Sequence, residues 1–342
     1  MLLKRLLLRA PLRLYHPSSP LIRSLSHISH KIPPNAWDSH MHIIGPPSKY
    51  PVSPTARYTP PHIHSLSSAL AFESTLNIPN LVLVQPSIYG TDNSCLLDAL
   101  KALGPKRGRG VVGIDPDTVT VEQLERWHEL GVRGVRINLK SVGKRMDELG
   151  FGRLVKRHAE RVKGLGWVVQ LYVDMENLVW LENVVPDLGV RICLDHFASP
   201  ALPVSPRRSK KPQRIAYDPY ALPGFTSLIT LLHQGSTYLK LSGAYRISAD
   251  PKTYRDLEPL ALELLQATGG EKLVFATDWP HTRFEGVDVD IAGFAEKVVG
   301  WCEGDEKTVE KVFKLNAEDL WEDRREQGAI GTAVNWAIHV FI

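Results

Sequence analysis

The chain has 342 residues, of which 43% are hydrophobic and 23% charged, a composition typical of one large globular domain or two small ones. The net charge of +4 is mild and is not accompanied by a basic stripe with interleaved aromatic residues, which argues against nucleic-acid binding. Cys95, Cys193 and Cys302 are odd in number and far apart, so we predict neither a disulfide framework nor a cysteine-based zinc site, and we expect a reducing compartment. No apolar run reaches the length that spans a bilayer.

The N-terminal segment is basic and rich in leucine and serine. No acidic residue precedes Asp38, and leucines recur near the arginines at roughly helical spacing. This pattern is typical of an amphipathic mitochondrial presequence. We therefore predict that residues 1–34 form a disordered targeting presequence outside the fold. The alternatives are a plain disordered leader or a misassigned start, which would leave the protein in the cytoplasm.

From residue 35 onward, eight β-branched runs alternate with amphipathic, helix-like segments. The predicted strands are 37–44, 80–86, 110–114, 134–139, 167–173, 190–195, 238–242 and 272–277, and the predicted helices are 91–103, 121–130, 153–165, 175–185, 224–234 and 252–268. This alternation predicts an α/β fold in which a parallel sheet closes into a (β/α)8 TIM barrel over residues 35–322. The alternative is an open doubly wound sheet, but no Gly-x-Gly-x-x-Gly segment follows an early strand to support a dinucleotide-binding version.

Two long loops and an apolar C-terminal tail depart from this alternation. Residues 46–65 follow the first strand, and residues 199–223, rich in proline and basic residues, follow the sixth. Both positions lie at the catalytic mouth of a barrel, so we expect the second loop to be a lid or a specificity loop. The tail, residues 323–342, is too short to span a membrane. A docking strand, an interface element or an unusual gene model would each account for it.

Three predicted strands end in residues that can carry chemistry. In DSHMHIIGP the alternation of a strand predicts that Asp38, His40 and His42 share one face, with Asp38 supporting the two histidines. LDHFASP places His196 at the end of the sixth strand, and ATDWPHT places Asp278 at the end of the eighth. A lone histidine at a strand end is usually structural. Because these residues converge on the rim that holds the active sites of (β/α)8 barrels, we predict that they form an active site.

Five segments together resemble the amidohydrolase-related family, in particular its branch of 2-pyrone-4,6-dicarboxylate lactonases. They are DSHMHIIGP, GVRGVRINL, LDHFASP, KLSGAYRIS and ATDWPHT, and the resemblance extends from about residue 37 to residue 321. The resemblance implies a distorted (β/α)8 barrel that hydrolyses a small lactone or a related cyclic ester.

The resemblance also bears on whether the protein binds a metal ion. In the wider superfamily, a carbamylated lysine and further histidines join the His-x-His pair and the last aspartate around one or two divalent ions. Here the fifth strand offers Gln170 and Tyr172, and the seventh runs into Ser242 without a histidine, so the sequence argues against a binuclear site. Since the lactonase branch needs no metal, we expect that none is required. One ion such as zinc, held by His40, His42, His196 and Asp278, is the alternative.

The expected substrate contacts follow from carboxylate chemistry and from the resemblance. Arg136 and Arg246 end or follow predicted strands, and the guanidinium fork matches a carboxylate. For Arg136 the alternative is a salt bridge inside the barrel. The resemblance adds the hydrogen-bonding candidates Tyr58, Ser87, Tyr172 and His281. Lactonases of this branch carry a further arginine after the fourth strand, but LKSVGKRMDE gives no clean match here, which leaves the second carboxylate site and the exact substrate open.

These residues lead to a mechanistic hypothesis and two rivals. Asp278 takes a proton from the attacking water, while His40, His42 and His196 donate hydrogen bonds to the lactone carbonyl. In the first rival, the same residues bind a metal for hydrolysis or for non-oxidative decarboxylation of an aromatic acid. The second rival is a catalytically dead barrel that serves as a ligand-binding or interaction protein, against which the presence of His40 and Asp278 argues. The expected partner is a small carboxylated molecule, and the oligomeric state stays open.

Overall fold

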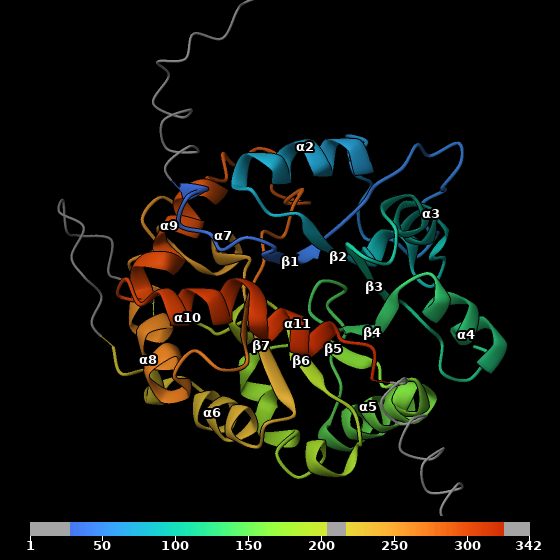
Figure 1. Cartoon of the computed structure of the whole chain (residues 1–342). Helices are drawn as coiled ribbons and strands as arrows, with labels where there is room; N and C mark the ends of the chain where they lie inside the picture. Colours follow the sequence, from blue (N-terminus) through green and yellow to red (C-terminus); the bar gives the residue numbers. More distant parts are fainter. Residues whose placement is uncertain (1–27, 204–216, 325–342) are drawn as a thin grey trace, which may run out of the picture.

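A computed structural model describes residues 28–203 and 217–324 of the chain (Figure 1). The predicted presequence up to residue 27, part of the predicted lid and the C-terminal tail from residue 325 lie outside the described residues. The predicted boundary at residue 35 needs correction, because Ile28 and Ile32 are both buried in the hydrophobic core. Four residues apart, their side chains can lie on one side of a helical turn, so the packed part of the chain begins before residue 35.

Eight parallel strands form one sheet in which each strand pairs with its neighbours in chain order, which confirms the predicted barrel (Figure 1). The strands are β1 (Trp37–Met41), β2 (Asn80–Val84), β3 (Gly108–Val112), β4 (Val132–Asn138), β5 (Val168–Tyr172), β6 (Ile192–Leu194), β7 (Thr237–Leu241) and β8 (Leu273–Phe275). The segment after β8 closes the sheet against β1. The amide of Asp278 donates to the carbonyl of His40 over 2.9 Å, and the amide of His42 donates to the carbonyl of Trp279 over 2.8 Å.

Helices surround the sheet in Figure 1. They are α2 (Leu66–Leu76), α3 (Ser94–Leu103), α4 (Val121–Glu129), α5 (Glu148–Val162), α6 (Phe225–His233), α7 (Ala244–Ile247), α8 (Glu258–Thr268), α9 (Ile291–Trp301), α10 (Glu306–Glu310) and α11 (Asn316–Trp321). The side chains of Thr120 and Asp147 cap α4 and α5 by accepting hydrogen bonds from backbone amides of the first turn, as helix N-termini require. No helix among residues 28–203 and 217–324 is long and apolar enough to cross a membrane.

The crossover between β5 and β6 departs from the regular barrel and from the predicted helix 175–185. Two short 3-10 helices, η3 (Met175–Trp180) and η4 (Val185–Asp187), replace an α-helix there. Pro186 lies in η4, and proline has no amide hydrogen to continue an α-helical ladder. The barrel is therefore distorted on this side.

The N-terminal end of the barrel is closed by apolar side chains. Leu320 and Trp321 of α11 pack in one buried cluster with Trp37 of β1 and Tyr238 of β7. The Nε of Arg109 on β3 donates to the carbonyl of Trp321 over 3.0 Å. Because this end is filled, the opposite end, where the strands finish at their carboxyl termini, is the one left for a site.

Candidate active site

An irregularity in β1 places its two histidines. The register of β1 against β2 shifts between Asp38 and Met41, as in a β-bulge. The Asp38 carboxyl lies beside Glu73 of α2 and accepts from the amide of His40 over 2.9 Å, whereas the neighbouring Ser39 meets Trp321 inside the barrel. The prediction that Asp38 shares a face with His40 and His42 was therefore wrong, because the bulge breaks the two-residue alternation. Asp38 supports His40 through the backbone.

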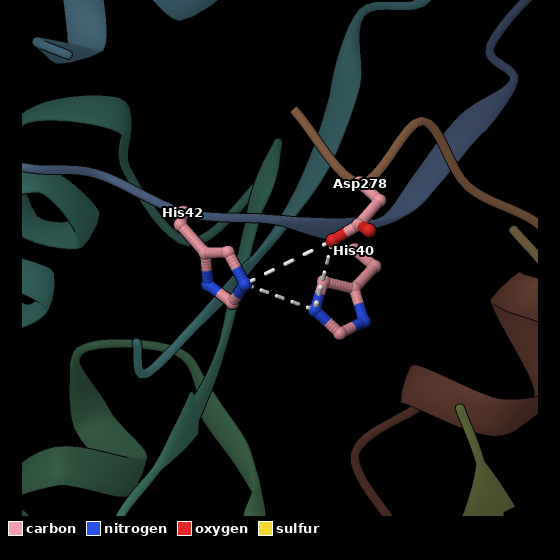
Figure 2. Close-up of side chains that lie close together, drawn as sticks. All are labelled: His40, His42 and Asp278. Carbon is pink, nitrogen blue, oxygen red and sulfur yellow. Dashed lines mark hydrogen bonds and ion pairs between the residues drawn. The ribbon is translucent and has the colours of Figure 1, made fainter. Parts of the chain in front are cut away.

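His40, His42 and Asp278 form a buried cluster at the C-terminal end of the barrel (Figure 2). The Nε2 atoms of the two histidines are 3.3 Å apart, and the Oδ1 atom of Asp278 lies 3.8 Å from that of His40 and 3.9 Å from that of His42. The side chain of His40 is fully buried, and that of His42 is 6% exposed. The structure thus brings together the three residues that the sequence placed on the first and last strands.

The two oxygens of Asp278 have different surroundings. Oδ2 accepts from the hydroxyl of Tyr245 over 2.7 Å and from the Nε of Arg246 over 2.6 Å. Oδ1 is buried and has no hydrogen-bond partner among the described residues. Although burial acts to raise the pKa of Asp278, the Arg246 guanidinium and the neighbouring imidazoles hold this pKa well below its usual range. Asp278 is therefore ionised at neutral pH, with one oxygen fixed and the other available to accept a proton.

His196 joins the cluster from the end of β6. Its Nε2 lies 3.7 Å from Oδ2 of Asp278, and its Nδ1 is 2.8 Å from the hydroxyl of Ser242. Gly243 makes room for the ring: its φ is +57°, and a Cβ there would lie 2.7 Å from Nδ1 of His196. Burial lowers the pKa of His196 to about 4, so the imidazole is neutral at physiological pH.

Beneath the cluster lies a charged network that the sequence analysis missed. Lys240 on β7 is fully buried, and its Nζ lies 3.2 Å from Nδ1 of His40 and 3.3 Å from Oδ1 of Asp195. Oδ2 of Asp195 accepts from Arg136 and from Gln170, at 3.0 and 3.1 Å. The signal was present in YLKLS, where strand alternation puts Lys240 on the same inward face as Tyr238. A lysine at a fully buried strand position needs partners, and its partners identify the network.

Eight of the ten predicted site residues line one cavity with an empty volume of about 350 Å³, part of it open to solvent. They are His42, Tyr58, Ser87, Arg136, Tyr172, His196, Arg246 and Asp278. His40 is not among the lining residues and lies one layer deeper, against the network of Lys240 and Asp195. His281 is also absent from the lining: its ring packs against Tyr245 and Phe72. The structure therefore gives these two histidines a supporting position.

Among the described residues, both predicted arginines retain N–H groups without a hydrogen-bond partner, and both line the cavity. Arg136 uses three of its five N–H groups, two on Asp195 and one on the carbonyl of Gln85, so two remain. The salt bridge weighed as the alternative for Arg136 thus exists alongside its place in the cavity wall. Arg246 uses two N–H groups, on Asp278 and on the carbonyl of Thr282, so three remain.

A third arginine, which the sequence analysis did not assign, lies at the rim. Arg283 lines the cavity, stacks over the ring of Tyr58 at 5.4 Å and donates to the carbonyl of Ser141 over 3.0 Å. No ion pair joins it to a carboxylate of the described residues. By contrast, the basic residues of LKSVGKRMDE, Lys140, Lys144 and Arg145, line a neighbouring cavity with Phe151 and Trp180. Arg283 is thus the additional cation at the catalytic cavity.

The cluster contains the residue types that bind divalent metals, with ligand atoms of His40, His42 and Asp278 within 4.8 Å of one another. Its hydrogen bonding does not fit a metal, however. When the Nζ of Lys240 donates to Nδ1 of His40, which lies 3.2 Å away, the single proton of a neutral imidazole sits on Nε2, the atom that faces the cluster. Oδ1 of Asp195 also lies 3.2 Å from Nδ1, so Asp195 is the alternative partner of this nitrogen. In this arrangement His40 has no lone pair to offer a metal.

The chain belongs to the amidohydrolase family, whose model matches residues 37–322. This confirms the family resemblance and the expectation of a hydrolase. The chain is 32% identical to 4-sulfomuconolactone hydrolase of Hydrogenophaga intermedia, over 74% of this chain and 77% of that protein. It is 28% identical to 2-pyrone-4,6-dicarboxylate hydrolase of Comamonas testosteroni, over 73% of this chain and 78% of that protein.

Solved structures share the fold. A protein of Agrobacterium tumefaciens superposes with a TM-score of 0.69 at 24% identity, covering 85% of this chain and 97% of that one. An amidohydrolase of Burkholderia multivorans with bound zinc superposes with a TM-score of 0.60 at 20% identity, covering 84% of this chain and 98% of that one. At these identities the structures support the barrel fold and nothing finer.

Proposed function

We propose that the protein hydrolyses a small lactone that carries negatively charged groups, with Asp278 as the general base. The observation that carries the proposal is the asymmetry of Asp278. Its Oδ2 is held by Tyr245 and Arg246, while its Oδ1 has no hydrogen-bond partner among the described residues. The two named relatives hydrolyse lactones, which supports hydrolysis over decarboxylation as the reaction.

The reaction begins when Oδ1 of Asp278 takes a proton from water and the hydroxide oxygen bonds to the lactone carbonyl carbon. The carbonyl electron pair moves to its oxygen and forms a tetrahedral oxyanion. The oxyanion then collapses, the bond between the carbonyl carbon and the ring oxygen breaks, and the departing oxygen takes the proton back from Asp278. The products are a new carboxyl group, which ionises, and a hydroxyl group on one open chain.

Of the three histidines predicted as donors to the carbonyl oxygen, His196 is the one that the hydrogen bonding favours. It lines the cavity, and when the hydroxyl of Ser242 donates to its Nδ1, its proton sits on Nε2. His42 donates from Nδ1 to the carbonyl of Val84 over 2.7 Å, so its Nε2 carries no proton while the ring is neutral. Burial lowers the pKa of His42 to about 3, which keeps the ring neutral. His42 therefore acts as an acceptor, and His40 supports it from below.

Substrate charge is matched by arginines. Arg246 and Arg136 have five N–H groups between them that find no partner in the described part of the chain, enough to hold one carboxylate bidentately. We assign the second anionic group to Arg283, whose guanidinium lies at the cavity rim without a carboxylate partner in the described ranges. The names of both relatives indicate a lactone with a second acidic group, a sulfonate or a carboxylate, which fits two separate cationic positions.

A metal-assisted hydrolysis is the second candidate, favoured by the residue types in the cluster of His40, His42 and Asp278. The residues involved would be His40, His42, His196 and Asp278. A divalent ion supplies polarisation of a carbonyl and a lowered pKa for bound water. The hydrogen bond from Lys240 to His40 opposes this arrangement.

The test is the variant Asp278→Asn, assayed on 2-pyrone-4,6-dicarboxylate and 4-sulfomuconolactone with protein treated with a chelator. We expect kcat to fall by about 10²- to 10⁴-fold, the usual contribution of a general base, with an unchanged circular dichroism spectrum. Asp319→Asn removes a carboxylate from α11 at the closed end of the barrel and should keep its turnover. Full activity of Asp278→Asn, or no activity of the wild type on any carboxylated or sulfonated lactone, would refute the proposal.

The basic, acid-free sequence before Asp38 supports a further proposal, that the part of residues 1–34 that precedes Ile28 directs the protein to mitochondria. Residues 1–34 fused to a fluorescent protein should accumulate in mitochondria, and Arg5→Glu with Arg9→Glu should abolish this accumulation. Diffuse cytoplasmic fluorescence of the unmodified fusion would contradict the proposal.

A further inference from the structure

We propose that Lys240 is a positioning residue, which fixes the proton of His40 on Nε2 and so keeps the His-x-His pair hydrogen-bonded within the protein instead of ligating a metal. The inference concerns a residue to which neither the sequence analysis nor the proposed reaction gives a role. It describes the protein without substrate, so it can be tested whether or not the lactone proposal holds.

Four groups form an unbroken line of polar contacts through the first strand. Nζ of Lys240 lies 3.2 Å from Nδ1 of His40, Nε2 of His40 lies 3.3 Å from Nε2 of His42, and Nδ1 of His42 lies 2.7 Å from the carbonyl of Val84. At one end an ammonium group can only donate, and at the other end a carbonyl can only accept. Each neutral imidazole has one donor and one acceptor nitrogen.

These end groups fix the direction of every hydrogen bond in the line. His42 must donate to Val84 from Nδ1, so its Nε2 accepts. His40 accepts from Lys240 at Nδ1, so its Nε2 carries the proton and donates to Nε2 of His42. The chain runs from Lys240 through His40 and His42 to the carbonyl of Val84, and every proton in it has one position. Neither imidazole then points a free lone pair at the cluster.

Burial makes this arrangement persistent. Lys240, His40 and Asp195 are 0–1% exposed, so water does not compete for these hydrogen bonds. In residues 28–203 and 217–324, Nζ contacts Nδ1 of His40, Oδ1 of Asp195 and, at 5.5 Å, the ring of Trp321. Asp195 is itself held at Oδ2 by Arg136 and Gln170, which keeps its carboxylate beside the ammonium group. Lys240 is therefore held in place to donate.

The network also shows what would follow if Lys240 lost its donor. Oδ1 of Asp195 lies 3.2 Å from Nδ1 of His40. Without the ammonium group, His40 can donate from Nδ1 to Asp195, which leaves Nε2 with a lone pair. A histidine whose second nitrogen donates to a carboxylate is the usual form of a metal ligand, and such outer partners change metal affinity by about 10- to 100-fold. With Lys240 present the His40–His42 pair is hydrogen-bonded, and without its ammonium group the same pair can bind a metal.

The experiment measures the tautomer of His40 directly, on the full chain after chelator treatment and at neutral pH. Two-dimensional NMR of protein labelled with ¹⁵N-histidine shows which ring nitrogen carries the proton, and the signals of His40 are assigned by their loss in His40→Gln. We expect the proton on Nε2 in the wild type and on Nδ1 in Lys240→Met. Lys272→Met, which removes a lysine that pairs with Asp319 of α11, should leave the signals of His40 unchanged.

Zinc titration gives the second measurement, with a control for charge. Lys240→Met and Lys240→Gln both lack the positive charge, but glutamine can still donate to Nδ1. We expect Lys240→Met to bind zinc at least tenfold more tightly than Lys240→Gln. Equal zinc affinities of the two variants would overturn the proposal, as would a wild-type His40 with its proton on Nδ1. The wild-type spectrum decides the matter even if a substitution at this buried position prevents folding.

Discussion

Replacement of Arg246 by glutamine tests how the cavity couples substrate binding to the base. In the free protein the Nε of Arg246 donates to Oδ2 of Asp278 over 2.6 Å, and three further N–H groups remain for a substrate carboxylate. A hydrogen bond that involves a charged group contributes about 1.5–3 kcal/mol, so Arg246→Gln should lower kcat/KM for a carboxylated lactone by about 10- to 150-fold. For an uncharged lactone of the same ring the binding loss should be much smaller.

The same substitution should change the pH dependence. Asp278 accepts a proton only when it is ionised, so activity is lost as the pH falls through its pKa. Burial acts to raise this pKa, but the Arg246 charge and the imidazoles hold it well below the usual value for an aspartate. Removal of the guanidinium must therefore raise the pKa of Asp278 and move the acid limb of the kcat/KM profile to higher pH.

The assay is the profile of kcat/KM from the lowest pH at which the protein stays folded up to pH 8, with the carboxylated and the uncharged lactone measured in parallel. Arg283→Gln is the matched control, because Arg283 contacts Tyr58 and Ser141 but forms no hydrogen bond to Asp278. It should reduce the binding of the charged substrate and leave the acid limb in place. An Arg246→Gln profile with an unmoved acid limb would refute the electrostatic reasoning, and equal losses on both lactones would refute carboxylate binding by Arg246.

Two further predictions concern the cavity rim and the core. Arg283→Met should raise KM for a lactone with two anionic groups by about 10-fold or more, and change KM little for one with a single carboxylate. Lys144→Met, in the neighbouring cavity, is the control and should change the KM of neither substrate. Equal effects of Arg283→Met on both substrates would show that Arg283 does not bind the second anionic group. Burial and the nearby Asp38 raise the pKa of Glu73 well above its usual range, so the folded state loses stability as the pH rises above the pKa of the unfolded chain. Glu73→Gln removes this cost. In urea titrations, the free energy of unfolding of Glu73→Gln relative to that of the wild type should therefore increase by up to about 1.4 kcal/mol per pH unit above pH 4.5. A difference that does not change with pH would contradict this.

The barrel could be predicted from the sequence because each strand is a short β-branched run between amphipathic helices. All eight predicted strands occur, and they pair in chain order. Pattern alone did not reveal the crossover between β5 and β6, where two 3-10 helices, Met175–Trp180 and Val185–Asp187, stand in place of the expected helix. Nor could it place Ile28 and Ile32 in the core, because the basic composition around them is that of a leader.

The site was predictable where a residue type is unusual for its position. Histidines and an aspartate at strand ends identified His42, His196 and Asp278, which do line the cavity. The face of Asp38 could not be derived, because a bulge in β1 interrupts the alternation on which the prediction rested. His281 follows Asp278 by three residues, but both have left-handed backbone, with φ of 64° and 61°, and the turn carries the imidazole behind Tyr245.

Lys240 and Arg283 show two different reasons for a missed residue. Lys240 lies in an alternating strand whose pattern already places it inside the barrel, so the information was in the sequence. Arg283 reaches the cavity through a loop whose path follows from tertiary contacts to Ser141 and Tyr58, residues that are far from it in the sequence. The sequence does not give distances between loops at the mouth of the barrel, so the position of Arg283 at the cavity could be found only from the structure.

The most direct test of the central claim is the rate of ring opening of carboxylated and sulfonated lactones by chelator-treated wild-type protein and Asp278→Asn, measured side by side with and without added zinc. The account predicts that the metal-free wild type opens the ring, that added zinc does not increase its rate, and that Asp278→Asn is slower by about 10²- to 10⁴-fold. A wild type that is inactive until zinc is added would contradict the account, and so would an Asp278→Asn variant that matches the wild type.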